Sequence, residues 1–185
     1  MSYNPRACGA KCDECPLRGQ PVVPPDINPN ALPLLFVSDA PGPQESMKGV
    51  TNFGPAGQKL DFLLRQIGPT TPKRSAFRHT HAILCRPDTP GIVGKRRFDI
   101  RTYMAWLSRE NKQRKKLGHV PLITPFQACF PRLEAEIEAT VLEAERTKSN
   151  FVIVPTGNFA FGQVTGAMKS SSIMKWRGSV LPVEA

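Results

Sequence analysis

Cysteine spacing is the feature of this sequence that most clearly indicates chemistry. Cys12 and Cys15 form a C-x-x-C pair, which lets two thiolates of one turn reach the same metal or cluster. Cys85 follows a short apolar run, and Cys129 lies in the first turns of an expected helix, whose positive end favours a thiolate. These two local and two distant thiolates could close a four-cysteine site. The alternative is that all four are buried, inert side chains.

The number of cysteines points the same way. The chain has 5 cysteines in 185 residues, and three of them fall within the first fifteen. In a reducing cytosol, metal or redox chemistry explains this better than disulfides do. The sequence has no apolar run of about 18 residues, and its N-terminus lacks the layout of a signal peptide. We expect a cytoplasmic, monomeric protein with no membrane partner and a single domain over residues 1–185.

Charge indicates the partner. The formal net charge of +10 favours a polyanion, and DNA is the first choice, over a basic protein that binds no such ligand. Residues 95–116 hold nine Lys or Arg, with Phe98, Tyr103 and Trp106 among them. Basic side chains neutralise phosphates and aromatic rings stack on bases, so residues 91–120 are predicted to be a DNA-contacting insertion. The alternative is a solvated helix whose aromatic residues pack inward.

Short apolar runs and helical patterns supply the elements that must position these residues. Residues 32–39, 81–85 and 151–155 are each predicted to be a strand that runs into a polar or Gly/Pro loop. Helical spacing over residues 60–67 ends at Gly68, and Thr124, Pro125 and Gln127 form a capping box that begins another helix. This alternation predicts an α/β three-layer sandwich with a central, mainly parallel sheet flanked by helices. Ligands collect at the carboxyl ends of such strands, so residues 38–45 are the first place to look for chemistry.

Seven motifs carry a resemblance to a known family. In order they read CDECPL, LLFVSDAPGPQE, GPAGQKLDFLL, THAILCRP, FQACFPRLEAEI, FVIVPTGNFAF and KWRGSV. Together they resemble the family 4 uracil-DNA glycosylases and their phage relatives, over nearly the whole chain except the basic insertion. The resemblance implies a uracil-DNA glycosylase-like fold and a 4Fe-4S cluster on Cys12, Cys15, Cys85 and Cys129, with Cys8 as the spare. Residues 1–31 would then be an N-terminal cluster-binding segment. Zinc is the chemical alternative, because four sulfurs in tetrahedral geometry serve both.

The resemblance also implies a catalytic residue. A glycosylase flips the nucleotide out of the helix, supports a cationic sugar with a carboxylate, and stabilises the leaving base anion. The family motif G-E-A-P-G corresponds to residues 38–42, and Asp39 takes the acidic position with a side chain one methylene shorter. Its neighbours Ala40, Pro41, Gly42 and Glu45 are then expected to line the substrate. The alternative for Asp39 is to cap the turn that follows it.

The base-binding positions depart from the family pattern. In the family segment Gly-x-Pro-Phe-Val-Gly the Phe stacks on the flipped base, but residues 49–54 place the aromatic one position late. Either Phe53 serves after a local shift, or Asn52 faces the base. The family Thr-Asn pair, whose Asn reads the uracil edge, becomes Thr80-His81, and a histidine lacks the paired donor and acceptor of an amide.

Two further family features concern the C-terminal end of the match and the loop of residues 95–99. Arg177 is expected to contact the substrate, but the family His-Pro-Ser motif that follows is absent before Ala185, so we expect a longer native protein or a shortened domain. A crosslinking relative has a Lys-Arg-Arg-Ile-His loop whose histidine attacks the sugar. Residues 95–99 here read KRRFD, so no covalent histidine adduct is expected.

The sequence therefore predicts a 4Fe-4S uracil-DNA glycosylase-like repair enzyme that hydrolyses the N-glycosidic bond of uracil or another damaged base in DNA. The alternative is a catalytically inactive iron-sulfur DNA-binding module, as the N-terminal domain of a phage DNA polymerase or another replication protein. In either case a replication or repair polymerase is an expected partner.

Overall fold

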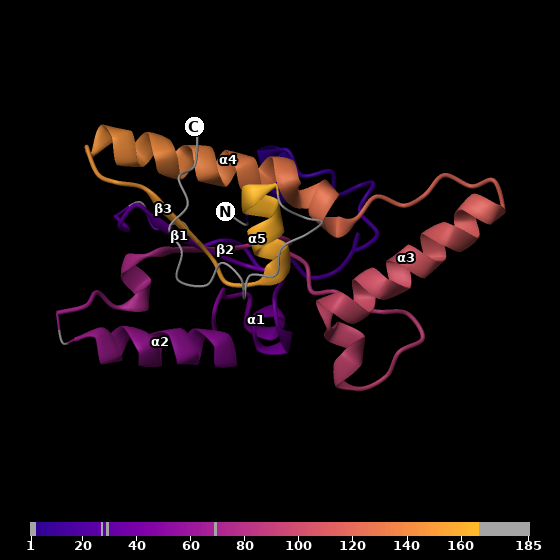
Figure 1. The fold of residues 1–185 in the computed structure, drawn as a ribbon, viewed down its shortest axis with the longest axis horizontal. Helices are drawn as coiled ribbons and strands as arrows, with labels where there is room; N and C mark the ends of the chain where they lie inside the picture. Colours follow the sequence, from indigo (N-terminus) through magenta and orange to yellow (C-terminus); the bar gives the residue numbers. More distant parts are fainter. Residues whose placement is uncertain (1–2, 27, 29, 69, 167–185) are drawn as a thin grey trace.

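A parallel sheet lies at the centre of the computed structural model, which describes residues 3–26, 28, 30–68 and 70–166 (Figure 1). Its strands are β1 (Leu34–Ser38), β2 (Arg78–His81) and β3 (Val152–Pro155), in the order β2-β1-β3. Both outer strands pair with β1 in parallel. The middle residues of β1 are Leu35, Phe36 and Val37, and all three are buried, as expected for a central strand of apolar residues.

Helices cover both faces of this sheet. In Figure 1, α4 (Pro125–Arg146) runs along one side, and α1 (Pro43–Lys48) and α2 (Pro55–Ile67) lie on the other. The short helix α5 (Asn158–Thr165) follows β3, and α3 (Ile100–Lys116) projects away from the sheet. Three 3-10 turns complete the described elements: η1 (Pro5–Cys8), η2 (Arg74–Ala76) and η3 (Lys95–Phe98). The predicted three-layer α/β fold is confirmed.

The start of α4 follows from its local sequence. Thr124 Oγ1 accepts a hydrogen bond from the Gln127 amide at 3.1 Å, and Gln127 Oε1 accepts one from the Thr124 amide at 2.8 Å. Pro125 occupies the first helical position, where no amide hydrogen is needed. The predicted capping box is therefore present, and it places Cys129 in the second turn of α4.

The second strand lies earlier than predicted. The sequence indicated residues 81–85, but β2 comprises Arg78–His81, and the apolar residues 82–84 are buried outside the ladder. The chain there pairs with the N-terminal segment, because the Val23 amide donates to the Leu84 carbonyl at 2.9 Å and Val22 forms an antiparallel bridge with Cys85. Burial of apolar residues was read correctly, but hydrophobicity alone does not say which buried residues belong to the ladder.

The basic insertion is helical and anchored by one face. Tyr103 and Leu107 of α3 are each 1% exposed within the main hydrophobic cluster, and Trp106 packs against that cluster. The Tyr103 and Trp106 rings lie 5.4 Å apart. The prediction that Tyr103 stacks on DNA bases is therefore wrong, and the inward-packing alternative holds for this residue. Among the described residues, no helix is both long and apolar enough to cross a membrane.

Candidate active site and cysteine cavity

Four of the cysteines line one cavity of about 210 Å³. Cys12 and Cys15 come from the N-terminal segment, Cys85 from the chain after β2, and Cys129 from α4. Residues separated by more than a hundred positions thus share one space.

Backbone hydrogen bonds hold the N-terminal segment over this cavity. The Lys11 amide donates to the Ala128 carbonyl of α4 at 2.8 Å, and the bridge between Val22 and Cys85 fixes the far end of the segment. A turn between them brings the Cys15 amide to the Cys12 carbonyl at 3.3 Å. Cys8 is not among the residues that line the cavity.

The electrostatics of the cavity favour neutral thiols until a cation is present. Burial, opposed by a backbone hydrogen bond from Leu17, raises the pKa of Cys15 to about 11. Burial and then the charges of the neighbouring cysteines raise the pKa of Cys85 to about 12. Burial and the charge of Cys129 raise the pKa of Cys12, although the charge of Arg6 acts in the opposite direction. Metal ligation releases such protons, so four thiols at one cavity are a donor set that fits a metal or a cluster.

The shape of the cavity bears on the kind of group it could hold. Within the described ranges, no three His, Cys, Asp or Glu side chains are grouped closely enough to hold a metal ion. Cys12, Cys15, Cys85 and Cys129 nevertheless all line one shared space of about 210 Å³.

A second set of functional groups lies at the carboxyl edge of the sheet. Ser38 ends β1 directly opposite His81, the last residue of β2. The Ser38 hydroxyl lies 2.9 Å from the Thr156 hydroxyl, which follows β3. The three strand ends therefore converge where the fold class predicts a ligand site.

Asp39 follows β1 at this edge, and its carboxylate faces α5. Oδ1 accepts a hydrogen bond from the Ala160 amide at 2.8 Å, and the Phe159 amide also donates to the carboxylate. Burial raises the pKa of Asp39, while these two amides and the charge of Arg101 act to lower it. Asp39 thus caps the start of α5 rather than the turn that follows it in sequence.

The loop after Asp39 is shaped by Glu45, whose side chain turns back toward the backbone. Its Oε2 accepts a hydrogen bond from the Gly42 amide at 2.6 Å, and the residue is only 6% exposed. Of the other predicted substrate contacts in this loop, Pro41 is buried and Ala40 packs against the hydrophobic core. Glu45 therefore holds the loop in shape.

The loop of residues 49–54 contains Asn52 and Phe53, which differ in burial. Asn52 is 6% exposed, and its Nδ2 lies 2.8 Å from His79 Nδ1. His79 Nε2 lies 3.0 Å from the Arg74 carbonyl and donates to it, so His79 Nδ1 accepts a hydrogen bond from Asn52 Nδ2. Phe53 is 44% exposed, with Lys48 Nζ 5.9 Å from its ring centroid. Of the two residues, only Phe53 therefore presents its side chain to solvent.

His81 is held neutral at the end of β2. It is 1% exposed, and burial, the charge of Arg132 and the charge of His79 lower its pKa to about 3. Its Nδ1 has no hydrogen-bond partner among the described residues. A buried ring nitrogen without a partner is costly, which is expected where a ligand completes the bonding.

A cleft of about 720 Å³ joins the loop after Asp39 to the basic insertion. Pro43 lines one side, and Gly94, Lys95, Arg97, Phe98 and Asp99 line the other. Within the cleft wall, Arg97 pairs with Asp88 at 2.6 Å and Arg86 lies 3.7 Å from the Phe98 ring centroid. Asp99 caps α3 by accepting from the Thr102 amide at 2.8 Å. The KRRFD loop is thus next to the loop that carries Asp39.

Sequence reasoning missed the buried guanidinium of Arg132, which lies beside the end of β2. Arg132 is fully buried and donates to Glu136 Oε2 at 2.8 Å and to Thr80 Oγ1 at 2.9 Å. Tyr3 donates to the other Glu136 oxygen at 2.7 Å. An Arg and a Glu four residues apart usually form a surface pair on a helix, so spacing gave no signal of burial. The remaining predicted site residue, Arg177, lies outside the described residues.

Comparison with known proteins gives one result for nearly the whole chain. A family model described as the uracil DNA glycosylase superfamily matches residues 24–184. No curated protein matches the chain. The matched range contains the sheet edge, Cys85 and Cys129.

Proposed function

Because the chain belongs to the uracil-DNA glycosylase superfamily, we propose that it is a DNA glycosylase that hydrolyses the N-glycosidic bond of uracil or another damaged base. The observation that carries the proposal is the position of Asp39. Its carboxylate is held by the first amides of α5, at the sheet edge where His81 ends β2. A fixed carboxylate at this edge is what a cationic sugar requires.

The reaction places two demands on these residues. As the glycosidic bond breaks, the ionised Asp39 stabilises the positive charge on the sugar or orients the attacking water. The hydrogen bonds from α5 fix its direction, so little reorganisation is needed when the charge develops. Phe53 provides an exposed ring on which the flipped base stacks.

A binding module is the second candidate, and a specific observation favours it. Asp39 Oδ1 already accepts the Ala160 amide, and Asn52 already bonds His79. These contacts would also stabilise a fold that has lost its chemistry. Such a module would bind DNA as part of replication or repair machinery, with a polymerase as partner.

One assay separates the two candidates. The protein is incubated with single- and double-stranded oligonucleotides that contain uracil, and alkali then reveals abasic sites. Cleavage that is lost in Asp39→Asn but kept in Glu138→Gln, an exposed acidic control on α4, supports the enzyme. No cleavage alongside salt-sensitive DNA binding supports the module.

For the cysteine cavity we propose a 4Fe-4S cluster held by Cys12, Cys15, Cys85 and Cys129, with zinc as the alternative. The four thiols that line one cavity support a group with sulfur ligands, and tetrahedral sulfur geometry serves both a cluster and zinc. When bound, the group would tether the N-terminal segment to α4 and to the chain after β2.

The cofactor is tested on protein purified without oxygen. A cluster gives a brown protein with broad visible absorbance and about four irons per chain, and Cys85→Ala and Cys129→Ala lose the colour while Cys8→Ala keeps it. Colourless protein with one zinc per chain would overturn the cluster. The unfolding temperature of each variant provides a readout that is independent of DNA cleavage.

A further inference from the structure

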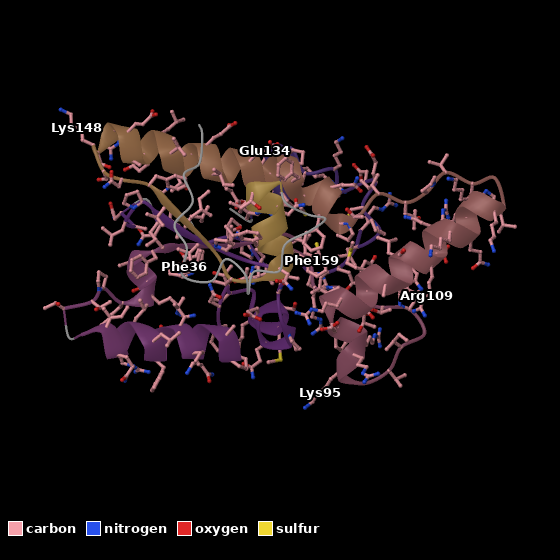
Figure 2. The ribbon with its side chains drawn as sticks, viewed as in Figure 1. Phe36, Lys95, Arg109, Glu134, Lys148 and Phe159 are labelled. Atoms are coloured by element: carbon pink, nitrogen blue, oxygen red, sulfur yellow. The ribbon has the colours of Figure 1, made fainter. Side chains whose placement is uncertain are left out.

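Helix α3 carries a stripe of positive charge that takes no part in the proposed catalysis or in the cysteine cavity. With 3.6 residues per turn, five of its cations fall within about 120° of the helix circumference. We call these residues the basic stripe: Arg101, Arg109, Lys112, Lys115 and Lys116. All five are exposed, and among the described residues none of them takes part in an ion pair. Figure 2 labels Arg109 on this helix, whose far end projects away from the rest of the molecule.

The opposite face of the same helix anchors it. Tyr103 and Leu107 are each 1% exposed, and Trp106 packs beside them on the core. The one acidic residue within α3, Glu110, also lies on this side of the helix. The helix is therefore fixed on the body of the protein with its basic stripe turned outward.

A merely solvated helix face would not have this charge pattern. Surface helices commonly alternate the signs of residues three or four positions apart, because like charges at that spacing repel. Here Lys112 has a cation three residues before it, Arg109, and another four residues after it, Lys116. Lys115 and Lys116 also complement the helix C-terminus, but Arg109 and Lys112 are too far from it to do so.

The stripe begins at the candidate active site. Arg101 is close enough to Asp39 to lower the pKa of its carboxyl group, and Lys95 lines the cleft beside Pro43. From Arg101 to Lys116 the helix extends about 22 Å at 1.5 Å per residue. That length matches about six base pairs of duplex DNA at 3.4 Å each.

We propose that α3 is a rail for the phosphates of duplex DNA, which holds about six base pairs on one side of the target nucleotide. The ligand is the sugar-phosphate backbone, because the aromatic residues of the helix face inward and cannot stack on unpaired bases. Recognition along the rail is independent of sequence. The inference rests on the proposed action on DNA, but the rail requires no catalysis.

The first test measures binding to a uracil-free duplex over a range of salt concentrations. The triple variant Arg109→Gln, Lys112→Gln and Lys116→Gln is compared with Arg65→Gln, Lys73→Gln and Lys148→Gln, which removes the same charge from exposed positions off α3. Each lost phosphate contact reduces the slope of log K against log salt by about 0.9, so the rail variant loses between about two and three. Equal losses in both triples, or a larger loss on single strands than on duplex, would overturn the rail.

The second test asks on which side of the target nucleotide the rail holds the duplex. Excision is measured on duplexes with the uracil about two or about ten base pairs from either end, since the rail spans about six. Shortening one side slows excision by wild type at least tenfold and leaves the rail variant nearly unaffected, while shortening the other side changes neither. Equal sensitivity on both sides overturns the proposal. If neither duplexes nor single strands are cleaved, the glycosylase proposal fails, and the salt slopes alone decide the rail.

Discussion

The buried guanidinium of Arg132 donates from Nη2 to the backbone carbonyl of His81 at 2.8 Å. The same nitrogen also reaches the Ala82 carbonyl at 3.0 Å. Arg132 lies on α4 three residues after Cys129, so one helical turn separates the wall of the cysteine cavity from the end of β2. The cavity and the strand end are therefore parts of one rigid unit.

Removing this guanidinium leaves several buried groups without partners. Arg132→Met is expected to lower the free energy of unfolding by about 3–5 kcal/mol, because the buried Glu136 side chain would lose its cationic partner. Urea denaturation of the purified proteins measures the change. Arg146→Met is the matched control, because its ion pair with Glu143 is exposed, and it should leave the unfolding midpoint nearly unchanged. Similar losses in both variants would contradict a special role for the buried pair.

The buried histidine at the end of β2 makes stability depend on pH. His81 has a pKa of about 3 in the folded protein, against an ordinary value of 6.5. Below pH 6.5 His81 is protonated in the unfolded chain but stays neutral in the folded chain. The free energy of unfolding therefore decreases as the pH is lowered from about 6.5 to about 3. Between these pH values the unfolding temperature of His81→Asn should decrease less than that of wild type as the pH is lowered. His119→Asn, at an exposed position, should follow the wild-type curve.

The same substitution addresses base recognition. The resembling family has an asparagine where this chain has His81, and an amide offers uracil a donor and an acceptor together. His81→Asn is therefore expected to raise uracil excision by about tenfold, on the scale of one additional hydrogen bond. Single-turnover cleavage of a uracil oligonucleotide measures it, with an oligonucleotide carrying a different damaged base for comparison. A variant that loses cleavage of both substrates would show that His81 itself serves the reaction.

Local sequence predicted much of this fold, and distant partners account for the rest. The capping box at Thr124 and the apolar run of β1 depend on neighbouring residues, so both were recognisable in the sequence. The polar strand β2 is buried with partners that are distant in sequence: Arg132, more than fifty residues away, donates to the Thr80 hydroxyl and to the His81 carbonyl. For the same reason the sequence could suggest a turn cap for Asp39 but not its true partner on α5.

The last prediction tests whether the direction of the Asp39 carboxylate matters. A Cβ at Gly157 would lie 2.1 Å from Asp39 Oδ1, although its extended backbone suits any residue. Gly157→Ala must therefore push the carboxylate off α5 without straining the main chain. We expect kcat/KM for uracil excision to fall about a hundredfold, since small displacements of a catalytic group cost that much. Adding Asp39→Asn to Gly157→Ala should bring little further loss, because both changes remove the same oriented charge. Multiplied losses in the double variant would instead show that Gly157 acts independently of Asp39.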